Sequence, residues 1–233
     1  MSGRTRTRLA GGDAAARSND LWTSADWPRR QLPHGRHGLP RVVVETQQRA
    51  RILRATVDTV AEHGYERSCI DLVITAAGVS RRTFYHLYQD KEDCFLAAHA
   101  NAQRAIVDAA HRALQDVDPD RPAERLEAVV SALLDAAVAD PAAVHVCLGD
   151  VVALGVRGLE LREDTMRPLT DVLAEDPAAP TGLAAEIVVG GLCEVVRLAV
   201  RDGWAPELPT RLPDLVDWVA RGRRPSPWIC CPA

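Results

Sequence analysis

A short stretch in the N-terminal half carries the side chains whose chemistry is most evident. Its polar and basic groups are Arg81, Arg82, Thr83, Tyr85 and His86. Guanidinium groups bind phosphates and the acceptor edge of guanine, while hydroxyl and imidazole groups bind phosphates or base edges. Phe84, Leu87 and Tyr88 recur at the spacing of one helical face, which leaves the polar groups on the other face. The pattern predicts a helix that packs on a core and presents a DNA-binding surface.

Each of these polar side chains also has a plainer interpretation. Arg81 and Arg82 either reach base edges from the start of a recognition helix or form a solvated basic turn. Tyr85 is either a phosphate contact or a structural tyrosine, and His86 either a DNA contact or an exposed histidine. The surrounding residues favour DNA contact for the arginines, and the role of His86 stays open.

The residues before Arg81 predict a partner helix and a tight turn. Gly78 supplies the backbone freedom of a sharp corner, and the Ser80 hydroxyl is suited to cap the helix that follows. Residues 69–88 therefore read as a helix-turn-helix. We expect Ser68 to cap the first of its helices, with Asp71 completing a capping box.

Two longer helices are expected to position this unit. One spans residues 45–63 and ends at Gly64, and the other spans residues 91–114 and is capped by Asp90. Thr46 and Arg49, near the start of the first, are candidates for further contacts to the DNA backbone. Lys91 opens the other helix, where a positive charge opposes the helix dipole, which hints at an external anion.

Residues 45–105 resemble the tetracycline-repressor (TetR) family of bacterial transcription regulators. The matching groups are Arg51-Ile-Leu, Gly64-Tyr65, Ala77-Gly-Val-Ser80, Thr83-Phe-Tyr85 and Lys91-Glu92. The resemblance implies phosphate contacts by Tyr85 and Lys91. It also implies a homodimer in which the last two helices of each chain form a four-helix interface. Ile74 and Leu72 depart from the family pattern by being bulkier or more apolar, and we expect them to alter the packing of the first short helix.

Composition favours an all-α protein. Of 233 residues, 47% are hydrophobic but only 4% aromatic, so aliphatic helix packing is expected. No run of about 18 apolar residues predicts a membrane span, and no apolar segment follows Arg4, Arg6 and Arg8 as in a secretory signal. We therefore expect a cytoplasmic protein without a membrane partner, whose six cysteines are reduced thiols rather than redox sensors.

The charge is unevenly distributed along the chain. Residues 1–104 contain 16 Lys and Arg against 11 Asp and Glu, whereas residues 105–233 contain 12 against 21. A basic front and an acidic rear suit a protein that touches nucleic acid with one end. A GC-rich genome would explain why Lys91 is the only lysine, but not where the charge lies.

We divide the chain into four segments. Residues 1–44 form a disordered basic arm, 45–105 a DNA-binding domain, 106–222 a helical regulatory and dimerisation domain, and 223–233 a flexible tail. The arm contains a basic cluster of Arg29, Arg30, His34, Arg36 and His37. This cluster either enters the minor groove or neutralises phosphates, or is a solvated tail.

The rear of the chain predicts helices but no catalytic set. Helices are expected over residues 142–148, 151–173 (bent near Gly155 and Gly158), 181–200 and 212–221, after one that begins near Pro122 and is broken at Asp140-Pro141. Polar or large groups in apolar surroundings are His111, His145, Cys147, Arg162, Glu194, Arg197 and Trp204. They are candidates to line a ligand pocket or ordinary core and surface residues, and the sequence does not choose among them. No metal, cofactor or phosphate-loop spacing is found, so we expect no enzyme.

The resemblance to the TetR family implies a dimeric repressor that binds an operator in double-stranded DNA and is released by a small-molecule effector of unknown identity. The alternative is a similar regulator without a small-molecule ligand, controlled by a partner protein, or an activator.

Overall fold

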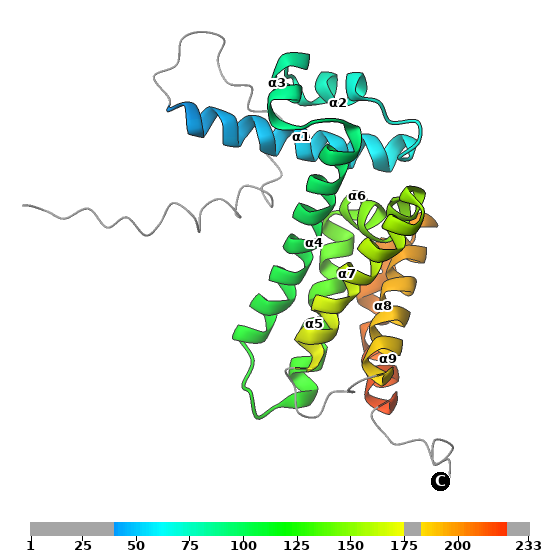
Figure 1. Cartoon of the computed structure of the whole chain (residues 1–233). Coiled ribbons are helices and arrows are strands. Elements are labelled where there is room, and N and C mark those ends of the chain that lie inside the picture. Colours follow the sequence, from blue (N-terminus) through cyan, green and yellow to red (C-terminus); the bar gives the residue numbers. More distant parts are fainter. Residues whose placement is uncertain (1–39, 175–182, 223–233) are drawn as a thin grey trace, which may run out of the picture.

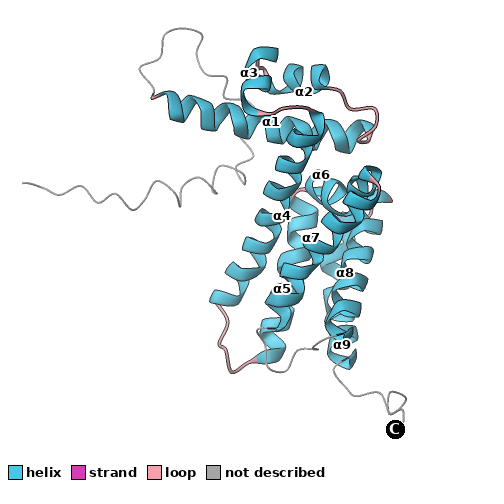
Figure 2. Cartoon of the chain, viewed as in Figure 1, coloured by secondary structure: helices cyan, strands magenta, loops and turns pink. Residues whose placement is uncertain are grey.

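The computed structural model describes residues 40–174 and 183–222, and every regular element in these ranges is helical. The α-helices are α1 (Arg41–His63), α2 (Ile70–Ala77), α3 (Arg81–Leu87), α4 (Lys91–Gln115), α5 (Pro122–Ala139), α6 (Pro141–Val144), α7 (Val156–Ala174), α8 (Leu183–Arg201) and α9 (Leu212–Gly222). We call α1–α3 the head and α4–α9 the body. The predicted all-α fold class is confirmed (Figure 2).

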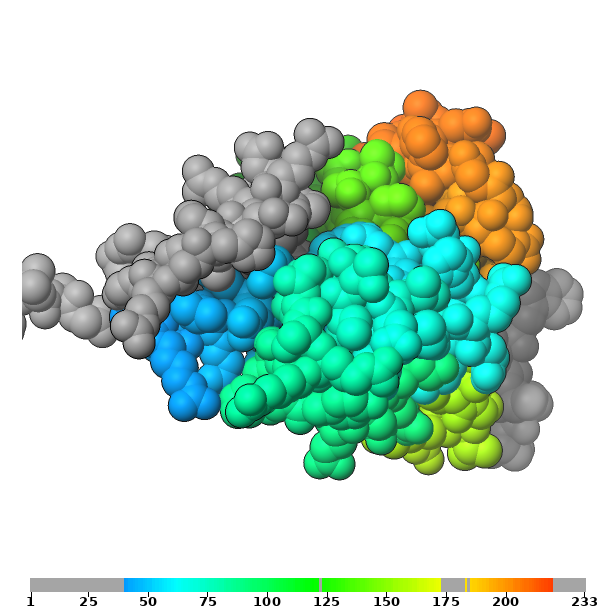
Figure 3. Space-filling model, turned by 90° about the horizontal axis from the view of Figure 1, so that it is seen from above, coloured from blue at the N-terminus to red at the C-terminus, as the bar shows by residue number. Residues whose placement is uncertain are grey.

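The head lies across one end of the body. α1 runs along the top of the body, α2 and α3 cover its outer side, and α4 descends from the head as the first helix of the body (Figure 1). Viewed from above, α2 and α3 form the outermost surface of the molecule (Figure 3). α4 passes without a break through residue 105, where the sequence places a domain boundary. The head and the first half of the body thus share one continuous helix.

The ends of the head helices largely follow the predicted signals. Gly64 ends α1 with φ 78°, and Gly78 ends α2 in the left-handed conformation with φ 61°. The Ser80 hydroxyl accepts the backbone N–H of Thr83, and the Asp90 carboxylate accepts that of Asp93. Both predicted caps are therefore confirmed.

Two predictions about helix starts are wrong. α1 begins at Arg41 rather than at residue 45, because the Pro40 carbonyl already accepts the N–H groups of Val43 and Val44, so part of the predicted arm is helical. Ser68 does not cap α2; its hydroxyl is buried and donates to the carbonyl oxygens of Gly64 at 2.8 Å and Thr59 at 3.3 Å.

The predicted 151–173 helix is broken rather than bent. After α6, a π-helical turn (His145–Gly149) and a 3₁₀ turn (Asp150–Leu154) precede Gly155, which has φ 63°. α7 starts only beyond it. Gly158 is then required because a Cβ there would lie 1.9 Å from the Val151 carbonyl oxygen. The 142–148 prediction likewise resolves into α6 and the π turn.

The core runs from the head into the body. In the head, Phe84, Val73, Ala77 and Tyr88 are buried against α1, and Phe84 and Tyr88 confirm the predicted core face of α3. Along α4 the fully buried residues include Ala98, Ala102 and Ala110. Their small side chains let neighbouring helices approach α4 closely.

No single helix in the described ranges is long and apolar enough to cross a membrane; one pair of adjoining helical segments passes that test together, but it is bent by 104°. The predicted basic cluster of the arm and the predicted 223–233 tail lie outside the described residues.

Candidate nucleic-acid interface

The exposed side of α3 carries most of the predicted DNA-binding residues. Arg81, Arg82, Tyr85 and His86 are exposed, while Phe84 between them is 1% exposed. The spacing of Arg81 to Tyr85 and of Arg82 to His86 is one helical turn, so the four side chains form two adjoining rows. Because the Ser80 cap fixes the first turn, these side chains leave the head from a defined backbone position.

Arg81 is not a free cation in this head. Its guanidinium pairs with the carboxylate of Asp71 on α2, and both side chains are more than half exposed. An exposed pair of this kind contributes about 0–1 kcal/mol to stability, so a phosphate or a guanine can replace Asp71 at small cost. The pair also orients the Arg81 side chain from α3 toward α2.

Thr83 is partly buried and faces the cap. Its hydroxyl lies 2.9 Å from the Ser80 hydroxyl, and its backbone N–H donates to the same oxygen. Thr83 therefore helps to hold the start of α3, which is a structural task that the sequence prediction did not include.

Lys91 lies differently from the prediction of an outward, phosphate-binding ammonium. It is partly buried, and its Nζ donates to the Tyr65 carbonyl oxygen at 3.0 Å and lies 4.1 Å from the centre of the Tyr65 ring. These contacts join the start of α4 to the loop after α1. A phosphate contact by Lys91 stays a prediction, and it would have to share the ammonium with Tyr65.

Thr46 and Arg49 are exposed on the N-terminal half of α1. The Thr46 hydroxyl donates to the Val42 carbonyl oxygen one turn back, at 2.9 Å, and the Arg49 guanidinium carbon lies 5.3 Å from the centre of the Tyr88 ring. Arg49 is thus held beside the end of α3. Leu72, expected to alter packing, is 41% exposed and leaves the core of the head.

Besides the Lys91 contact with Tyr65, two polar contacts tie the head to the body. The Arg54 guanidinium of α1 pairs with Asp140, which caps α6. The backbone N–H of Tyr65 donates to Asp150 Oδ1 at 3.3 Å. Within the body, Glu92 at the start of α4 pairs with Arg157 of α7.

Asp150, which accepts the Tyr65 amide of the head, also contacts His145 of the body. Its Oδ2 lies 2.8 Å from His145 Nε2, and this bond raises the pKa of His145 despite the partial burial of the ring. One carboxylate therefore bridges a backbone amide of the head and the first residue of the π turn. Val144, just before this turn, and Leu148, within it, line a cavity.

That cavity, of about 40 Å³, lies between α4, α5, α7 and α8. Its lining is mostly aliphatic: Ile106, Val107, Val130, Leu133, Leu134, Ala136, Val144, Leu148, Leu169, Val189, Leu192 and Val196, with Gln103, Thr165 and Cys193. The Thr165 hydroxyl donates to the Leu161 carbonyl oxygen and lies 3.3 Å from His99 Nε2. Burial lowers the pKa of His99, so the ring is neutral at pH 7.

The buried cysteines offer no reactive thiol at this cavity. Burial raises the pKa of Cys193 to about 11 and of Cys147 to about 12. It also raises the pKa of Cys94, in the head–body core, to about 11. The thiolate is the reactive form, so these side chains act as small apolar groups. Within the described ranges, no group of His, Cys, Asp or Glu has the arrangement of a metal site.

Comparison with known proteins agrees with this architecture. Residues 52–98 match the model of the bacterial regulatory proteins of the tetR family. The fatty acid degradation regulator FadR of Bacillus halodurans superposes with a TM-score of 0.68 at 20% identity, over 77% of this chain and 97% of that one. FadR of Bacillus subtilis, solved with stearoyl-CoA, has a TM-score of 0.63 at 17% identity, covering 74% and 97%. The ketosteroid regulator KstR2 of Mycobacterium tuberculosis gives 0.55 at 16%, covering 74% and 94%.

The chain has the head and the fold of the TetR family. The resemblance drawn from the sequence is thereby confirmed. At these identities the likeness to the solved structures establishes the fold alone. The roles of individual side chains in the TetR head rest on their geometry in this chain.

Sequence reasoning missed the residues that connect the TetR head to its body. Arg54, Asp140 and Asp150 come from three separate segments, and nothing in their spacing indicates that they meet. Asp140 was recognised as a helix breaker together with Pro141, but its pairing partner lies 86 residues earlier in the chain. His145 was one of several candidates for a pocket, and it lies instead at the junction.

Proposed function

We propose that this chain is a dimeric, DNA-binding transcriptional repressor whose release from its operator is triggered by a small molecule. The observation that carries the proposal is the exposed polar face of α3, mounted on a TetR head that is bonded to a body with an apolar cavity. The protein acts in the bacterial cytoplasm, where its operator is found.

The first part of the proposal is the contact with DNA. α3 enters the major groove, Arg81 and Arg82 reach base edges or phosphates, and Tyr85 donates its hydroxyl to a phosphate. His86 extends the same face. A side chain with half of its surface exposed, as Tyr85 has, can form this contact without moving the core of the head.

The second part is a homodimer through α8 and α9. Leu183, Ile187 and Trp218 are exposed by 71%, 59% and 44%, so these helices present an apolar face to solvent. A Cβ at Gly191 would lie 2.7 Å from the Trp218 ring, whereas one at Gly190 would meet nothing within 4 Å. Gly190 thus leaves a notch beside Ile187 that a side chain of a second copy would fill. Two heads about 34–36 Å apart would then read successive major grooves.

The third part is the response to an effector. A cavity of about 40 Å³ is far smaller than the roughly 300–1,000 Å³ of a ligand site, so a bound effector must enlarge it. Val144 and Leu148 line the cavity and flank His145, which binds Asp150 and through it the amide of Tyr65. An effector that prefers an enlarged body therefore favours a displaced head, which shifts the population away from the DNA-binding spacing.

The solved FadR of Bacillus subtilis contains stearoyl-CoA. The aliphatic lining of the cavity in this chain supports an effector with an apolar chain of the same general kind. A mainly hydrocarbon lining gains most from a hydrocarbon ligand, because each buried methylene contributes about 0.8 kcal/mol.

The decisive test is operator binding by matched variants. DNA fragments from upstream of the chain's own gene and its neighbours are footprinted first. Arg82→Ala and Tyr85→Phe should then weaken binding, and the former should also relax base preference at one position by about 1–3 kcal/mol. Arg112→Ala, an exposed arginine of α4 outside the head, should leave binding unchanged. Equal affinities in all three variants would remove the assignment of α3.

The effector step is tested by filling the cavity. Ala136→Val adds volume at a lining residue, so it should stabilise the chain by about 0.5–2 kcal/mol and suppress release by any effector. Operator affinity without effector should not change. If a thermal-shift screen finds no ligand for the unmodified chain, the alternative applies: control by a partner protein, or activation rather than repression. The small volume of the cavity is the observation that favours this alternative.

A further inference from the structure

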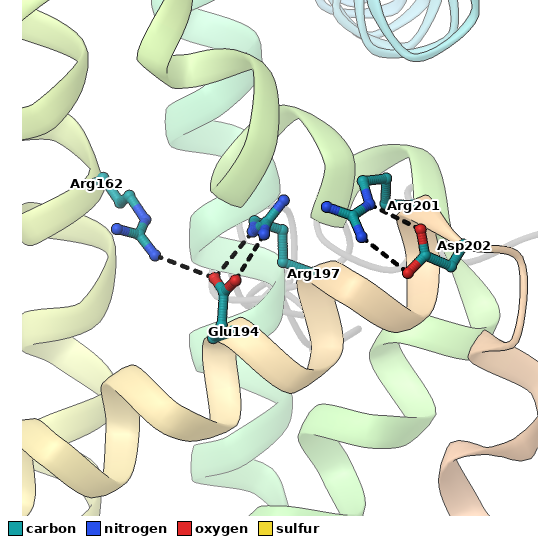
Figure 4. Close-up of polar contacts among 5 residues, drawn as sticks. All are labelled: Arg162, Glu194, Arg197, Arg201 and Asp202. Carbon is teal, nitrogen blue, oxygen red and sulfur yellow. Dashed lines mark hydrogen bonds and ion pairs between the residues drawn. The ribbon is translucent and has the colours of Figure 1, made fainter.

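A cluster of charged residues lies on the seam between α7 and α8, beside the cavity. Figure 4 shows Arg162 of α7 and Glu194 and Arg197 of α8 pointing toward one another. Arg162 lies one turn before Thr165 on α7, while Glu194 and Arg197 adjoin Cys193 and Val196 on α8. Thr165, Cys193 and Val196 all line the cavity. The cluster therefore lies beside the cavity wall, about one turn away along α7 and one residue away along α8.

The carboxylates of the cluster are already matched by other arginines. Arg197 donates to Glu194 through Nε at 2.9 Å and through a terminal nitrogen at 2.6 Å. Arg201 binds the neighbouring Asp202 in the same bidentate manner, at 2.7 and 2.9 Å. Each carboxylate thus has one guanidinium that faces it with two hydrogen bonds.

Among these three arginines, Arg162 is the one without a hydrogen-bonded carboxylate. Its contact with Glu194 is 3.7 Å long, which exceeds hydrogen-bond distance, and the described part of the chain gives its guanidinium no hydrogen bond. The side chain is 30% exposed and lies close enough to act electrostatically on the thiol of Cys193 in the cavity wall. Residues 105–233 contain more carboxylates than basic groups, so most arginines there can find a carboxylate to bind. A guanidinium with unused donors beside the cavity is therefore unexpected.

We propose that Arg162 holds the anionic end, a carboxylate or a phosphate, of an amphipathic ligand whose apolar chain occupies the enlarged cavity. The planar guanidinium fork matches either group bidentately. The proposal rests on the proposed effector site and names the class of its ligand. Glu194 is hydrogen-bonded to Arg197 and lies 3.7 Å from Arg162, so it competes only weakly with such a ligand for the Arg162 guanidinium.

The experiment compares ligands that share one tail and differ in the head. Decanoate, decyl phosphate and decanol are titrated into the full chain by isothermal titration calorimetry. At least one of the two anions should bind tighter than decanol by about tenfold or more, as a charge-assisted hydrogen bond provides. Which anion is preferred identifies the head group as a carboxylate or a phosphate.

Matched variants assign the preference to one side chain. Arg162→Gln should reduce the affinity for the anions to that for decanol. Arg167→Gln, on the same helix but paired with Asp164 at 3.0 Å, should keep the full preference. Glu194→Gln removes the competing carboxylate, so it should tighten anion binding and leave decanol unaffected. The thermal midpoint of each variant checks its fold.

The outcomes separate this inference from the proposed function. Equal affinity of the unmodified chain for decanol and both anions, or an unchanged preference in Arg162→Gln, overturns the role of Arg162 while the apolar cavity stands. Absence of binding by all three ligands overturns this inference and the effector step together. Operator binding by the head is measured separately and is not affected by either result.

Discussion

The head and the body use polar side chains in opposite ways. In the head, a compact apolar core around Phe84 lets Arg82, Tyr85 and His86 point into solvent. In the body, the polar groups nearest to the cavity are turned inward, and His99 binds Thr165 at a site from which water is largely excluded. The head is suited to a large charged partner that comes from outside, and the body to a smaller ligand whose apolar part must be enclosed.

The two regions also differ in how they are held together. α2 and α3 are short helices whose position depends on local signals, chiefly the left-handed Gly78 and the Ser80 cap. The body is built mostly from longer helices, with an irregular stretch, residues 145–155, where it meets the head. The head is held by local contacts, whereas the stretch of the body beneath it is irregular. A change in residues 145–155 would therefore move the head as a unit and alter the spacing of the two heads in the proposed dimer.

The largest expected effect is in the core of the head. Phe84→Ala should destabilise the head by about 3–5 kcal/mol because the ring is fully enclosed. Hydrogen exchange followed by mass spectrometry should show lost protection over residues 41–90, while the body keeps its protection. Val138→Ala, partly exposed on α5, is the control and should change stability by no more than about 0.5 kcal/mol. Uniform loss of protection in head and body would mean that the two regions unfold as one unit.

This difference explains which features the sequence predicted. The turn at Gly78, the caps Ser80 and Asp90 and the buried face of α3 depend on neighbours within a few residues, so they can be recognised from spacing alone. The prediction of a Ser68 cap was wrong because the hydroxyl donates instead to the carbonyl oxygens of Gly64 and Thr59, which precede it in the chain. The contacts of Lys91 were not predicted because they come from Tyr65, 26 residues earlier, which offers both a carbonyl and an aromatic ring.

The body was less accessible to such reasoning. Its apolar faces were predicted, but the cavity depends on how α4, α5, α6, the π turn, α7 and α8 meet, which periodicity does not describe. The break at Gly155 was anticipated only as a bend, because the steric conflict between Gly158 and the Val151 carbonyl exists only after the chain has folded back. Arg162, Glu194 and Arg197 were recognised as unusual, but their contact was not.

The second prediction tests the junction between the regions. Asp150→Asn keeps the shape of the side chain but removes the charge that faces His145, so it should destabilise the chain by about 1–3 kcal/mol. The amide of Tyr65, which donates to Asp150, should exchange faster with solvent. Asp164→Asn breaks an exposed pair with Arg167 and should change neither quantity measurably. Normal protection at Tyr65 in Asp150→Asn would mean that the junction does not depend on this carboxylate.

The third prediction uses two histidines whose pKa values are shifted in opposite directions by folding. The Asp150 bond raises the folded pKa of His145, so its contribution to stability is fully present below about pH 6.5 and is lost as pH rises through the folded value. Burial lowers the folded pKa of His99, so its contribution is present above about pH 6.5 and is lost as pH falls. Urea unfolding between pH 5 and 8 should show both slopes, and NMR titration should assign them.

A single variant separates the two histidines. His145→Gln should abolish the loss of stability on the alkaline side while the acid-side loss due to His99 persists. If the alkaline slope survives in His145→Gln, the charge that matters at the junction belongs to another group, and the bridge from the cavity to the head through Asp150 is wrong.

The smallest expected effect concerns the exposed pair between Asp71 and Arg81. Asp71→Asn should change stability by less than about 1 kcal/mol, since both groups are solvated. Operator binding should nevertheless tighten a few-fold, because Arg81 is released and a negative charge near the DNA phosphates is removed. The gain should shrink as salt shortens the Debye length from about 10 Å at 0.1 M. In the background of Arg81→Ala, Asp71→Asn should give less of this gain, because only the repulsion between Asp71 and phosphate is then relieved. Weaker operator binding by Asp71→Asn would mean instead that Asp71 orients Arg81 for the groove, and that the head, like the body, depends on an internal carboxylate to hold its arginine ready.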